Sequence, residues 1–134
     1  MYNKYSIVLA VAAFIKNTKG NILIVKKSLE EQIDASLWTI PVGKVKPEEP
    51  IIEALKREVN EEVGLGIVDY EWIGEYVFTS NGRYFHAQHF LCSVQSTGKV
   101  KLEQKLLEFA WITKHQLSSY SFPANIKKRL LQVL

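Results

Sequence analysis

One segment, from Gly43 to Leu65, constrains this chain more than any other. It reads GKVKPEEPIIEALKREVNEEVGL, and its second half has the pattern of an amphipathic helix. Pro50 suits the first helical position, and Gly64 suits the left-handed residue that ends a helix. At about 100° per residue, one face is apolar. It consists of Ile52, Leu55, Val59 and Val63. The segment therefore predicts a helix over residues 50–63 that packs on a sheet.

The same helix carries three glutamates within about one turn, Glu58, Glu61 and Glu62, at the border of the apolar face. Like charges at these spacings repel, and more strongly where solvent is partly excluded. Arg57 can reach Glu53 or Glu61, but one guanidinium cannot neutralise three carboxylates. Hard divalent cations bind carboxylate oxygens, and Mg²⁺ usually shares such sites with phosphate. The cluster therefore indicates a Mg²⁺ or Mn²⁺ site, although an isolated Glu-rich helix is more often a solvated surface.

The remaining elements alternate between strand and helix patterns. Residues 5–15 and 21–27 predict a strand pair around the turn NTKG, and residues 38–41 predict a short extended piece. Residues 70–80 and 84–94 predict a hairpin around NGR, residues 108–113 another strand, and residues 123–134 a helix that opens with proline. No repeat or linker divides the chain, so we expect one α/β domain over residues 1–134.

Composition excludes several classes of protein. With 134 residues, 47% of them hydrophobic, the chain can form a core without staples, and its single Cys92 cannot form an internal disulfide. Its longest early apolar run, SIVLAVAAFI, is too short to cross a bilayer. A net charge of +3 with scattered Lys and Arg gives no basic patch for nucleic acid. We therefore expect a cytoplasmic monomer or homodimer that binds neither membrane nor nucleic acid.

With its flanks, the segment resembles the signature of the Nudix hydrolases, G-x5-E-x7-R-E-U-x-E-E-x-G-U, where U is bulky and aliphatic. Every spacing is kept, at Gly43, Glu49, Arg57, Glu58, Val59, Glu61, Glu62, Gly64 and Leu65. The order of strands is also similar to that of the family. The resemblance implies an α/β/α sandwich with a mixed β-sheet between helices, and hydrolysis of a nucleoside diphosphate linked to another moiety, with divalent metal and an attacking water.

The resemblance also implies roles for single residues. The implied metal ligands are three glutamates and one backbone carbonyl, Glu58, Glu61, Glu62 and the carbonyl of Val42. One of the glutamates, often the first, would help to deprotonate water. Glu49 and Arg57 resemble the ion pair that fixes the loop to the helix in the catalytic site. Gly43 would let the loop backbone approach the metal.

Closer similarity is to the mutator-type nucleoside triphosphate pyrophosphohydrolases, which cleave oxidised dGTP to the monophosphate and pyrophosphate. Lys27 stands where those enzymes carry a basic phosphate contact, and Lys44 follows the first glycine of the signature. FPAN resembles an element whose asparagine, here Asn125, reads the base, although Asn125 also suits an ordinary first helical turn. Phe85 could stack on a base, but aromatic residues beside a sheet are more often core. Hydrolysis of dinucleotide polyphosphates or nucleotide sugars stays open, as does a catalytically silent nucleotide sensor.

Two positions depart from the family pattern. PVG replaces the usual Pro-Gly-Gly, so Val42 narrows the backbone freedom of the metal loop. A glutamate commonly found six residues before the tryptophan of the late strand is replaced by Lys105. Glu103 or Glu108 would have to substitute for it, or a second metal is bound differently, and we rank Glu103 first.

Overall fold

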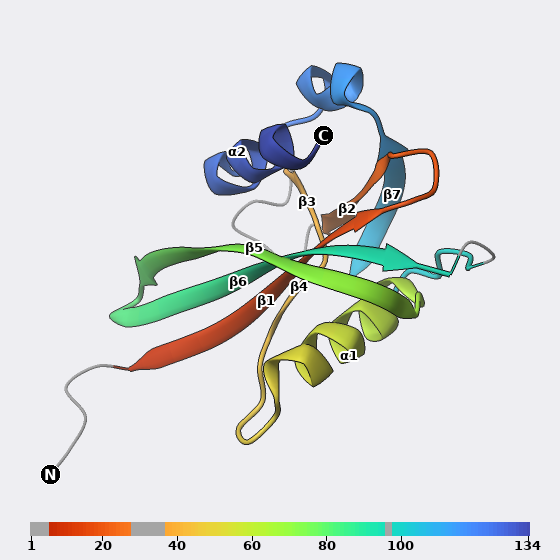
Figure 1. Ribbon diagram of the computed structural model, residues 1–134. Helices are drawn as coiled ribbons and strands as arrows, with labels where there is room; N and C mark the ends of the chain where they lie inside the picture. The colour runs from red at the N-terminus through yellow and green to blue at the C-terminus, as the bar shows by residue number, and fades with distance from the viewer. Residues whose placement is uncertain (1–5, 28–36, 96–97) are drawn as a thin grey trace, which may run out of the picture.

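The computed structural model describes residues 6–27, 37–95 and 98–134. Its centre is a seven-stranded sheet with the strand order β3-β2-β1-β6-β5 (Figure 1), while β4 pairs with β1 and β7 pairs with β2. The strands are β1 (Ile7–Lys16), β2 (Ile22–Lys27), β3 (Trp38–Thr39), β4 (Val42–Lys44), β5 (Ile67–Ser80), β6 (Arg83–Val94) and β7 (Leu106–Ile112). The predicted strands are present, with ends shifted by a few residues.

The sheet is mixed because β1 pairs parallel with β6, whereas the other pairs are antiparallel. β5 and β6 form the hairpin predicted around NGR, with Asn81 and Gly82 at φ angles of 51° and 72°. Two consecutive positive φ angles are what a tight two-residue hairpin turn requires. β1 and β2 pair at Lys16 and Ile22, beyond which β2 pairs with β3 and β7.

Two α-helices cover opposite faces of the sheet, α1 (Ile51–Val63) on one and α2 (Ala124–Val133) on the other (Figure 1). A 3-10 helix, η2 (Lys114–Ser119), precedes α2. The α1-side core consists of Val11, Ala13, Ile15, Leu23, Val25, Ala54, Leu55, Val59, Val63, Leu65, Phe90, Cys92 and Leu106. The α2-side core consists of Ala12, Phe14, Ile22, Ile24, Ile40, Ile112, Leu117, Ile126 and Leu130. The predicted α/β/α sandwich is confirmed.

Helix α1 has the ends and the buried face that its sequence predicts. It begins one residue late, because Pro50 is still extended at ψ 144° and serves as the N-cap. Gly64, left-handed at φ 68°, ends it and donates its N–H to the carbonyl of Asn60. Within the described ranges, no helix is long and apolar enough to cross a membrane.

Two segments fix what lies around α1. Strand β4 pairs with β1 through Val11 and Gly43, and it passes the helix on the way to the loop that opens it. After β6, the chain returns to the end of α1, where the N–H of Lys101 bonds the carbonyl of Val63 (2.8 Å) and that of Glu103 bonds Glu62 (2.9 Å). Side chains from β4, α1 and the segment before β7 are therefore held around one place.

Candidate active site

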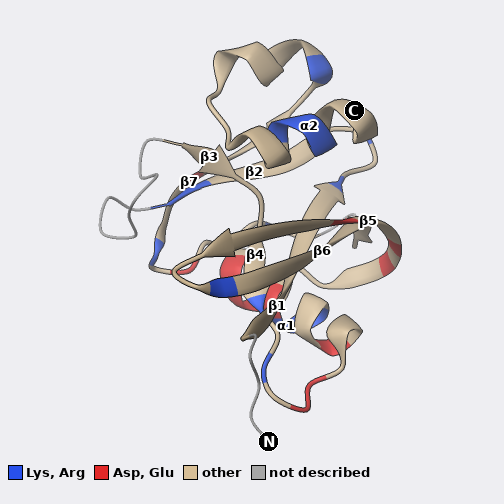
Figure 2. Cartoon of the chain, turned by 90° about the vertical axis from the view of Figure 1, so that its left-hand side faces the viewer, with Lys and Arg blue, Asp and Glu red and all other residues tan. Residues whose placement is uncertain are grey.

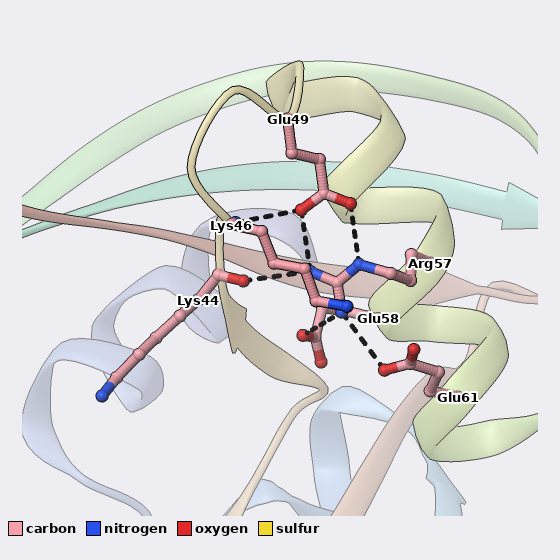
Figure 3. Close-up of polar contacts among 6 residues, drawn as sticks. All are labelled: Lys44, Lys46, Glu49, Arg57, Glu58 and Glu61. Carbon is pink, nitrogen blue, oxygen red and sulfur yellow. Dashed lines mark hydrogen bonds and ion pairs between the residues drawn. The ribbon is translucent and has the colours of Figure 1, made fainter.

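Arg57 is the centre of the polar network on α1 (Figure 3). It donates from Nε to Glu49 Oε2 (2.7 Å) and from Nη2 to Glu49 Oε1 (2.9 Å), which makes a bidentate pair. Nη2 also donates to the carbonyl of Lys44 (3.1 Å). Nη1 donates to Glu58 Oε1 (2.8 Å) and Glu61 Oε2 (3.2 Å). The predicted ion pair of Glu49 with Arg57 is confirmed, and it ties the loop before α1 to the helix.

The network changes the charge argument made from the sequence. An arginine has five N–H donors, and these five bonds engage the guanidinium fully. The hydrogen bond from Arg57, and then that from the backbone of Lys46, lower the pKa of Glu49 to about 2. The carboxylates of Glu49 and Glu58 raise the pKa of Arg57 above its usual value. The guanidinium of Arg57 thus donates hydrogen bonds to both Glu58 and Glu61. None of its five N–H groups donates to Glu62.

Gly43 has a role that concerns Glu58. A Cβ built on Gly43 would lie 1.9 Å from Cδ of Glu58. Any larger residue would therefore displace either β4 or the carboxylate. The resemblance implied a close approach of this backbone to a metal, and the structure adds a close approach to a glutamate of the cluster.

Glu62 is the carboxylate that the arginine network leaves out. The residue is 8% exposed, and its Oε2 is buried without a hydrogen-bond partner among the described residues. Burial, and then the neighbouring Glu58 carboxylate, raise the pKa of Glu62 to about 9. A buried polar oxygen without a partner costs free energy. Glu62 therefore marks a place where a bound cation would be stabilising.

A cavity of about 190 Å³ opens beside Glu62. It is lined by three carboxylates, two lysines and two apolar residues, namely Glu58, Glu62, Glu103, Lys27, Lys105, Val42 and Leu106. Carboxylate and carbonyl oxygens are the ligands that hard divalent cations prefer, and lysine is a compact phosphate-binding charge. Four predicted metal-ligand residues and one predicted phosphate contact thus line a single cavity.

The carboxylates are not yet gathered around a common point. Among residues 6–27, 37–95 and 98–134, no three His, Cys, Asp or Glu side chains form a cluster that could hold a metal ion as it stands. In this arrangement Oε1 of Glu58 accepts a hydrogen bond from Arg57. The partnerless oxygen of Glu62 and the oxygen donors of the cavity nevertheless fit a hard divalent cation in kind.

The structure separates the two glutamates considered as substitutes at the Lys105 position. Glu103 lines the cavity, and its backbone bonds the carbonyl of Glu62. Glu108 is exposed on β7. It lies on the same face of the strand as Ala110 and Ile112, which pack on the α2 side of the sheet. Only Glu103 of this pair is placed beside the other carboxylates, as its higher ranking expected.

The model of the NUDIX domain family matches residues 7–133 of the chain. The chain belongs to the Nudix family. Its signature is the segment that supplies β4, the loop tied by Arg57, and α1. Nudix hydrolases as a family generally use a divalent metal, in agreement with the donor types that line the cavity.

Named relatives place this Nudix chain among nucleotide hydrolases. It is similar to the 8-oxo-dGTP diphosphatase of Buchnera aphidicola subsp. Schizaphis graminum, 29% identical over 109 residues that make up 79% of this chain and 78% of the relative. It is also similar to the nucleoside triphosphatase NudI of Escherichia coli K12, 29% identical over 132 residues, 90% of this chain and 92% of the relative. A crystal structure of a MutT protein from Methanosarcina mazei Go1 superposes with a TM-score of 0.81 at 27% identity, over 98% of this chain and 97% of that one.

Like Glu49 and Arg57, the predicted metal ligand Glu61 and the predicted substrate contact Lys44 belong to the arginine network but do not line the cavity. Glu61 has a half-exposed side chain and shares Nη1 of Arg57 with Glu58. Lys44 contributes its carbonyl to Arg57, while its side chain extends away from the carboxylates (Figure 3). That side chain borders a separate groove of about 430 Å³ that also includes Ile7, Leu9, Lys46 and Arg83.

The two predicted base contacts lie on the α2 side of the sheet. Phe85 lies on the same face of β6 as Ala87, His89 and Leu91, and Leu91 packs against the α2-side core. Its ring stacks on Phe78, with centroids 4.9 Å apart and planes 5° from parallel. Asn125 lies half-buried in the first turn of α2. The same helix also carries Lys127, Lys128 and Arg129 (Figure 2). The structure therefore does not bring Phe85 and Asn125 into the carboxylate cavity.

Sequence reasoning missed two residues of the cavity, Lys105 and the apolar Leu106. Lys105 entered the prediction as a lost ligand, whereas it lines the same cavity as Glu103 and the glutamates of α1. Its spacing of two from Glu103 was the available signal. A short turn that places one side chain in a site can place a second one there. The spacing alone, however, does not show which residues line the same cavity.

Proposed function

We propose that this protein is a Mg²⁺- or Mn²⁺-dependent Nudix pyrophosphohydrolase that cleaves a nucleoside triphosphate to the monophosphate and pyrophosphate. The observation that carries the proposal is the cavity in which Glu58, Glu62 and Glu103 lie with Lys27. The names of the relatives, an 8-oxo-dGTP diphosphatase and a nucleoside triphosphatase, support nucleoside triphosphates as substrates, with oxidised purine deoxynucleotides among them.

The metal would be held by carboxylate oxygens and one carbonyl, those of Glu58, Glu61, Glu62, Glu103 and Val42. When bound, it would neutralise phosphate oxygens and acidify water. Gathering the ligands requires Glu58 to turn part of its carboxylate from Arg57. It also requires Glu62, which burial keeps protonated in the metal-free protein through a pKa of about 9, to release that proton.

Glu58 is the proton acceptor that the geometry favours. Its Oε1 accepts a hydrogen bond from Arg57, and the residue lines the cavity. Arg57 and Glu49 position it, because the same guanidinium is locked to the loop by the bidentate pair. Lys27, which lines the same cavity, would hold a phosphate oxygen.

The base would bind on the α2 side, at Phe85 and Asn125. The stack of Phe85 on Phe78 presents flat apolar rings, and both residues are partly exposed. An asparagine amide offers two donors and an acceptor, so Asn125 could read a purine edge in both directions. The nucleotide would then run from the α2 side to the carboxylate cavity.

A rival function has one observation in its favour. Dinucleotide polyphosphates and nucleotide sugars carry a second moiety. The groove of about 430 Å³, whose charged residues are Lys44, Lys46, Arg83, Glu48 and Glu49, has the volume and the polar side chains to receive one. For these substrates Lys44 would be a substrate contact beyond the phosphate chain. A silent sensor would bind the same nucleotides without turnover.

We further propose that residues 1–134 form one Nudix domain, acting in the cytoplasm as a monomer or homodimer and without nucleic acid. The family model covers nearly all of the described chain, which supports the single domain. Scattered positive charges support the expectation about nucleic acid.

A nucleotide panel tests the proposal. Each candidate is incubated with the protein and Mg²⁺, and phosphate is measured with and without added inorganic pyrophosphatase. We expect nucleoside triphosphates to give phosphate only after pyrophosphatase is added, and Glu62→Gln to lower kcat by about 10²-fold or more. Orthophosphate as the primary product would contradict the pyrophosphohydrolase assignment, and binding without turnover across the panel would support the sensor.

A further inference from the structure

Strand β5 is an edge of the sheet, and no strand in the described part of the chain pairs with its outer side. It stands last in the strand order, has 14 residues and pairs with β6 alone. β3, at the other end of that order, has two residues. Natural proteins protect a long edge with lysine, proline or a covering element, because its free N–H and C=O groups can pair with another strand. β5 contains no lysine, arginine or proline.

Much of the exposed apolar surface lies on β5. Of the twelve large apolar residues that are exposed in the described ranges, six belong to this strand, namely Val68, Tyr70, Trp72, Tyr76, Val77 and Phe78. Single exposed apolar residues are ordinary, but a contiguous set marks an interaction surface. Figure 1 shows that the turn end of the β5–β6 hairpin extends past both α1 and α2. Neither helix covers that end of the strand.

A bulge limits the part of the β5 edge that can pair regularly. The register of β5 on β6 shifts between Trp72 and Gly74, and such a bulge bends and twists the strand. A Cβ built on Gly74 would lie 2.3 Å from Nη2 of Arg129, so the arginine side chain occupies that position. From Gly74 to Ser80 the pairing with β6 has no further shift. The regular and uncovered part of the edge is therefore residues 75–80.

The hairpin turn determines which backbone groups of this part face outward. Ser80 and Arg83 flank a two-residue turn, and the residues that flank such a turn form a hydrogen-bonded pair. Along an antiparallel pair of strands, hydrogen-bonded and non-hydrogen-bonded residues alternate. The residues whose N–H and C=O groups point away from β6 are therefore Glu75, Val77 and Thr79.

We propose that a second copy of this chain pairs with this edge, β5 against β5 in antiparallel orientation, about a two-fold axis at Val77. In this register Val77 lies opposite Val77 of the second copy, and Glu75 lies opposite Thr79. The outward-facing N–H and C=O groups of both strands then meet as hydrogen-bonded pairs. The two sheets become one continuous sheet across the axis.

The aromatic side chains agree with this register. The rings of Tyr76 and Phe78 lie side by side with centroids 5.6 Å apart, and Phe78 stacks on Phe85. In the pair of strands, Tyr76 of each copy lies opposite Phe78 of the other. Aromatic pairs that face each other across strands stabilise a sheet. The row of rings that ends at the β5 edge in one copy therefore continues in the second copy.

The charges of β5 also agree with an axis at Val77. Glu75 is the single charged residue of the overlap, and it accepts a hydrogen bond from Gln88 of β6. The two copies of Glu75 lie about 13 Å apart along the strands, since four residues separate each from the position opposite its mate. An axis at Ile73 would instead place Glu71 opposite Glu75, and like charges directly opposite destabilise a pair.

This self-complementarity favours a second copy over an unrelated strand, because a two-fold interface must match its own reverse. The overlap is short. Five residues from each copy bury less than about 1,200 Å² in total, the low end for a specific interface, so we expect a dissociation constant on the order of 10 to 100 μM. The dimer is therefore one that forms and dissociates with protein concentration.

Sedimentation velocity across that concentration range is the first test. Val77→Lys places two ammonium groups opposite each other at the axis. Val68→Lys is the matched control, because Val68 lies on the same strand outside the overlap and is 58% exposed against 49% for Val77. We expect wild type and Val68→Lys to dimerise as concentration rises, and Val77→Lys to dimerise at least about tenfold more weakly. Thermal unfolding at low concentration checks that both variants are folded.

Two outcomes overturn the proposal in this first test. One is a wild type that stays monomeric at all concentrations, which would leave the β5 edge to a different chain. The other is an equal weakening by Val68→Lys and Val77→Lys, which would show a general effect of charge and no axis at Val77.

Disulfide formation is the second test, and it measures the register. Residues of a hydrogen-bonded pair have Cα atoms about 5.5 Å apart, which suits a disulfide. Val77→Cys should therefore cross-link the two copies under mild oxidation. Thr79→Cys should cross-link at least about tenfold more slowly, because its symmetry mate lies about 13 Å away along the strands. Cys92 is buried, so it does not compete. Equal or faster cross-linking of Thr79→Cys would overturn the register.

Neither test depends on the proposed function, because neither uses a nucleotide. A protein that dimerises through β5 yet hydrolyses no nucleotide would contradict only the assigned activity. Conversely, an active pyrophosphohydrolase that stays monomeric would contradict only the pairing of β5.

Discussion

Replacing Glu62 with glutamine tests the electrostatics of the cavity most directly. Glutamine has nearly the shape of a protonated glutamate and does not ionise. In the metal-free protein the pKa of Glu62 is raised from 4.5 to about 9, first by burial and then by Glu58. The folded state therefore keeps a proton that the unfolded chain releases. The stability that this group contributes is fully present below pH 4.5 and is lost as the pH rises towards 9.

The size of the effect follows from that interval. Each pH unit between the two pKa values costs about 1.4 kcal/mol of unfolding free energy. At about pH 7 the wild type has lost up to about 3 kcal/mol that Glu62→Gln retains. The glutamine amide brings two N–H groups that need partners in a buried site, so we expect a net gain of about 1 to 2 kcal/mol. For a chain of this length, that raises Tm by about 3 to 8 °C.

Thermal unfolding in EDTA across this pH interval is the assay. Glu61→Gln is the matched control, because Glu61 is half exposed and lies outside the cavity, so its replacement should not produce the same pH dependence. Added Mg²⁺ should stabilise the wild type and leave Glu62→Gln nearly unchanged, which reverses their order. A Glu62→Gln protein less stable than wild type at the high end of the interval, or a difference that ignores pH, would refute the reasoning.

Three further substitutions test other parts of the site and fold. Gly43→Ala should reduce kcat/KM by about 10²-fold by displacing Glu58, whereas Gly66→Ala, whose Cβ would meet nothing within 4 Å, should be neutral in the same kinetic assay. Burial, and then Arg129, lower the pKa of His89 from 6.5 to about 4. The wild type should therefore lose stability as the pH falls through that interval, and His89→Gln should lose less stability in acid unfolding. Asn125→Ala should cost about 1 to 3 kcal/mol in kcat/KM for the best purine triphosphate and little for poor substrates, and an equal loss for pyrimidines would reduce Asn125 to a helix-end residue.

The parts of the fold that sequence predicts well are those decided by neighbouring residues. Helix α1 follows from Pro50, Gly64 and a continuous apolar face, and the hairpin follows from Asn81 and Gly82, whose positive φ angles few other residues adopt cheaply. The arginine network was half predicted for the same reason. Spacing along one helix brings Arg57 to Glu61, while the bond to Glu49 was implied by resemblance rather than by spacing.

What sequence could not decide depends on pairing between distant segments. The parallel contact of β1 with β6 joins residues that no local pattern relates, and the segment before β7 meets the end of α1 only because the sheet returns it there. The sequence ranked Glu103 above Glu108, but it could not place either beside the carboxylates of α1. A register irregularity beside Lys27 puts Leu106 in the α1-side core and Glu108 on the other side of the sheet.

The three glutamates of α1 differ in their hydrogen bonds because of the shape of the Arg57 side chain. A guanidinium is a rigid planar fork, so binding Glu49 in a bidentate pair fixes the direction of its remaining donors. Those donors reach Glu58, Glu61 and the carbonyl of Lys44. Glu62, one residue further along the helix, has a buried Oε2 with no hydrogen-bond partner among the residues that the structure describes. Arg57 thus supplies the positive charge for two of the carboxylates, those of Glu58 and Glu61. Glu62 is the carboxylate that a bound cation would stabilise most.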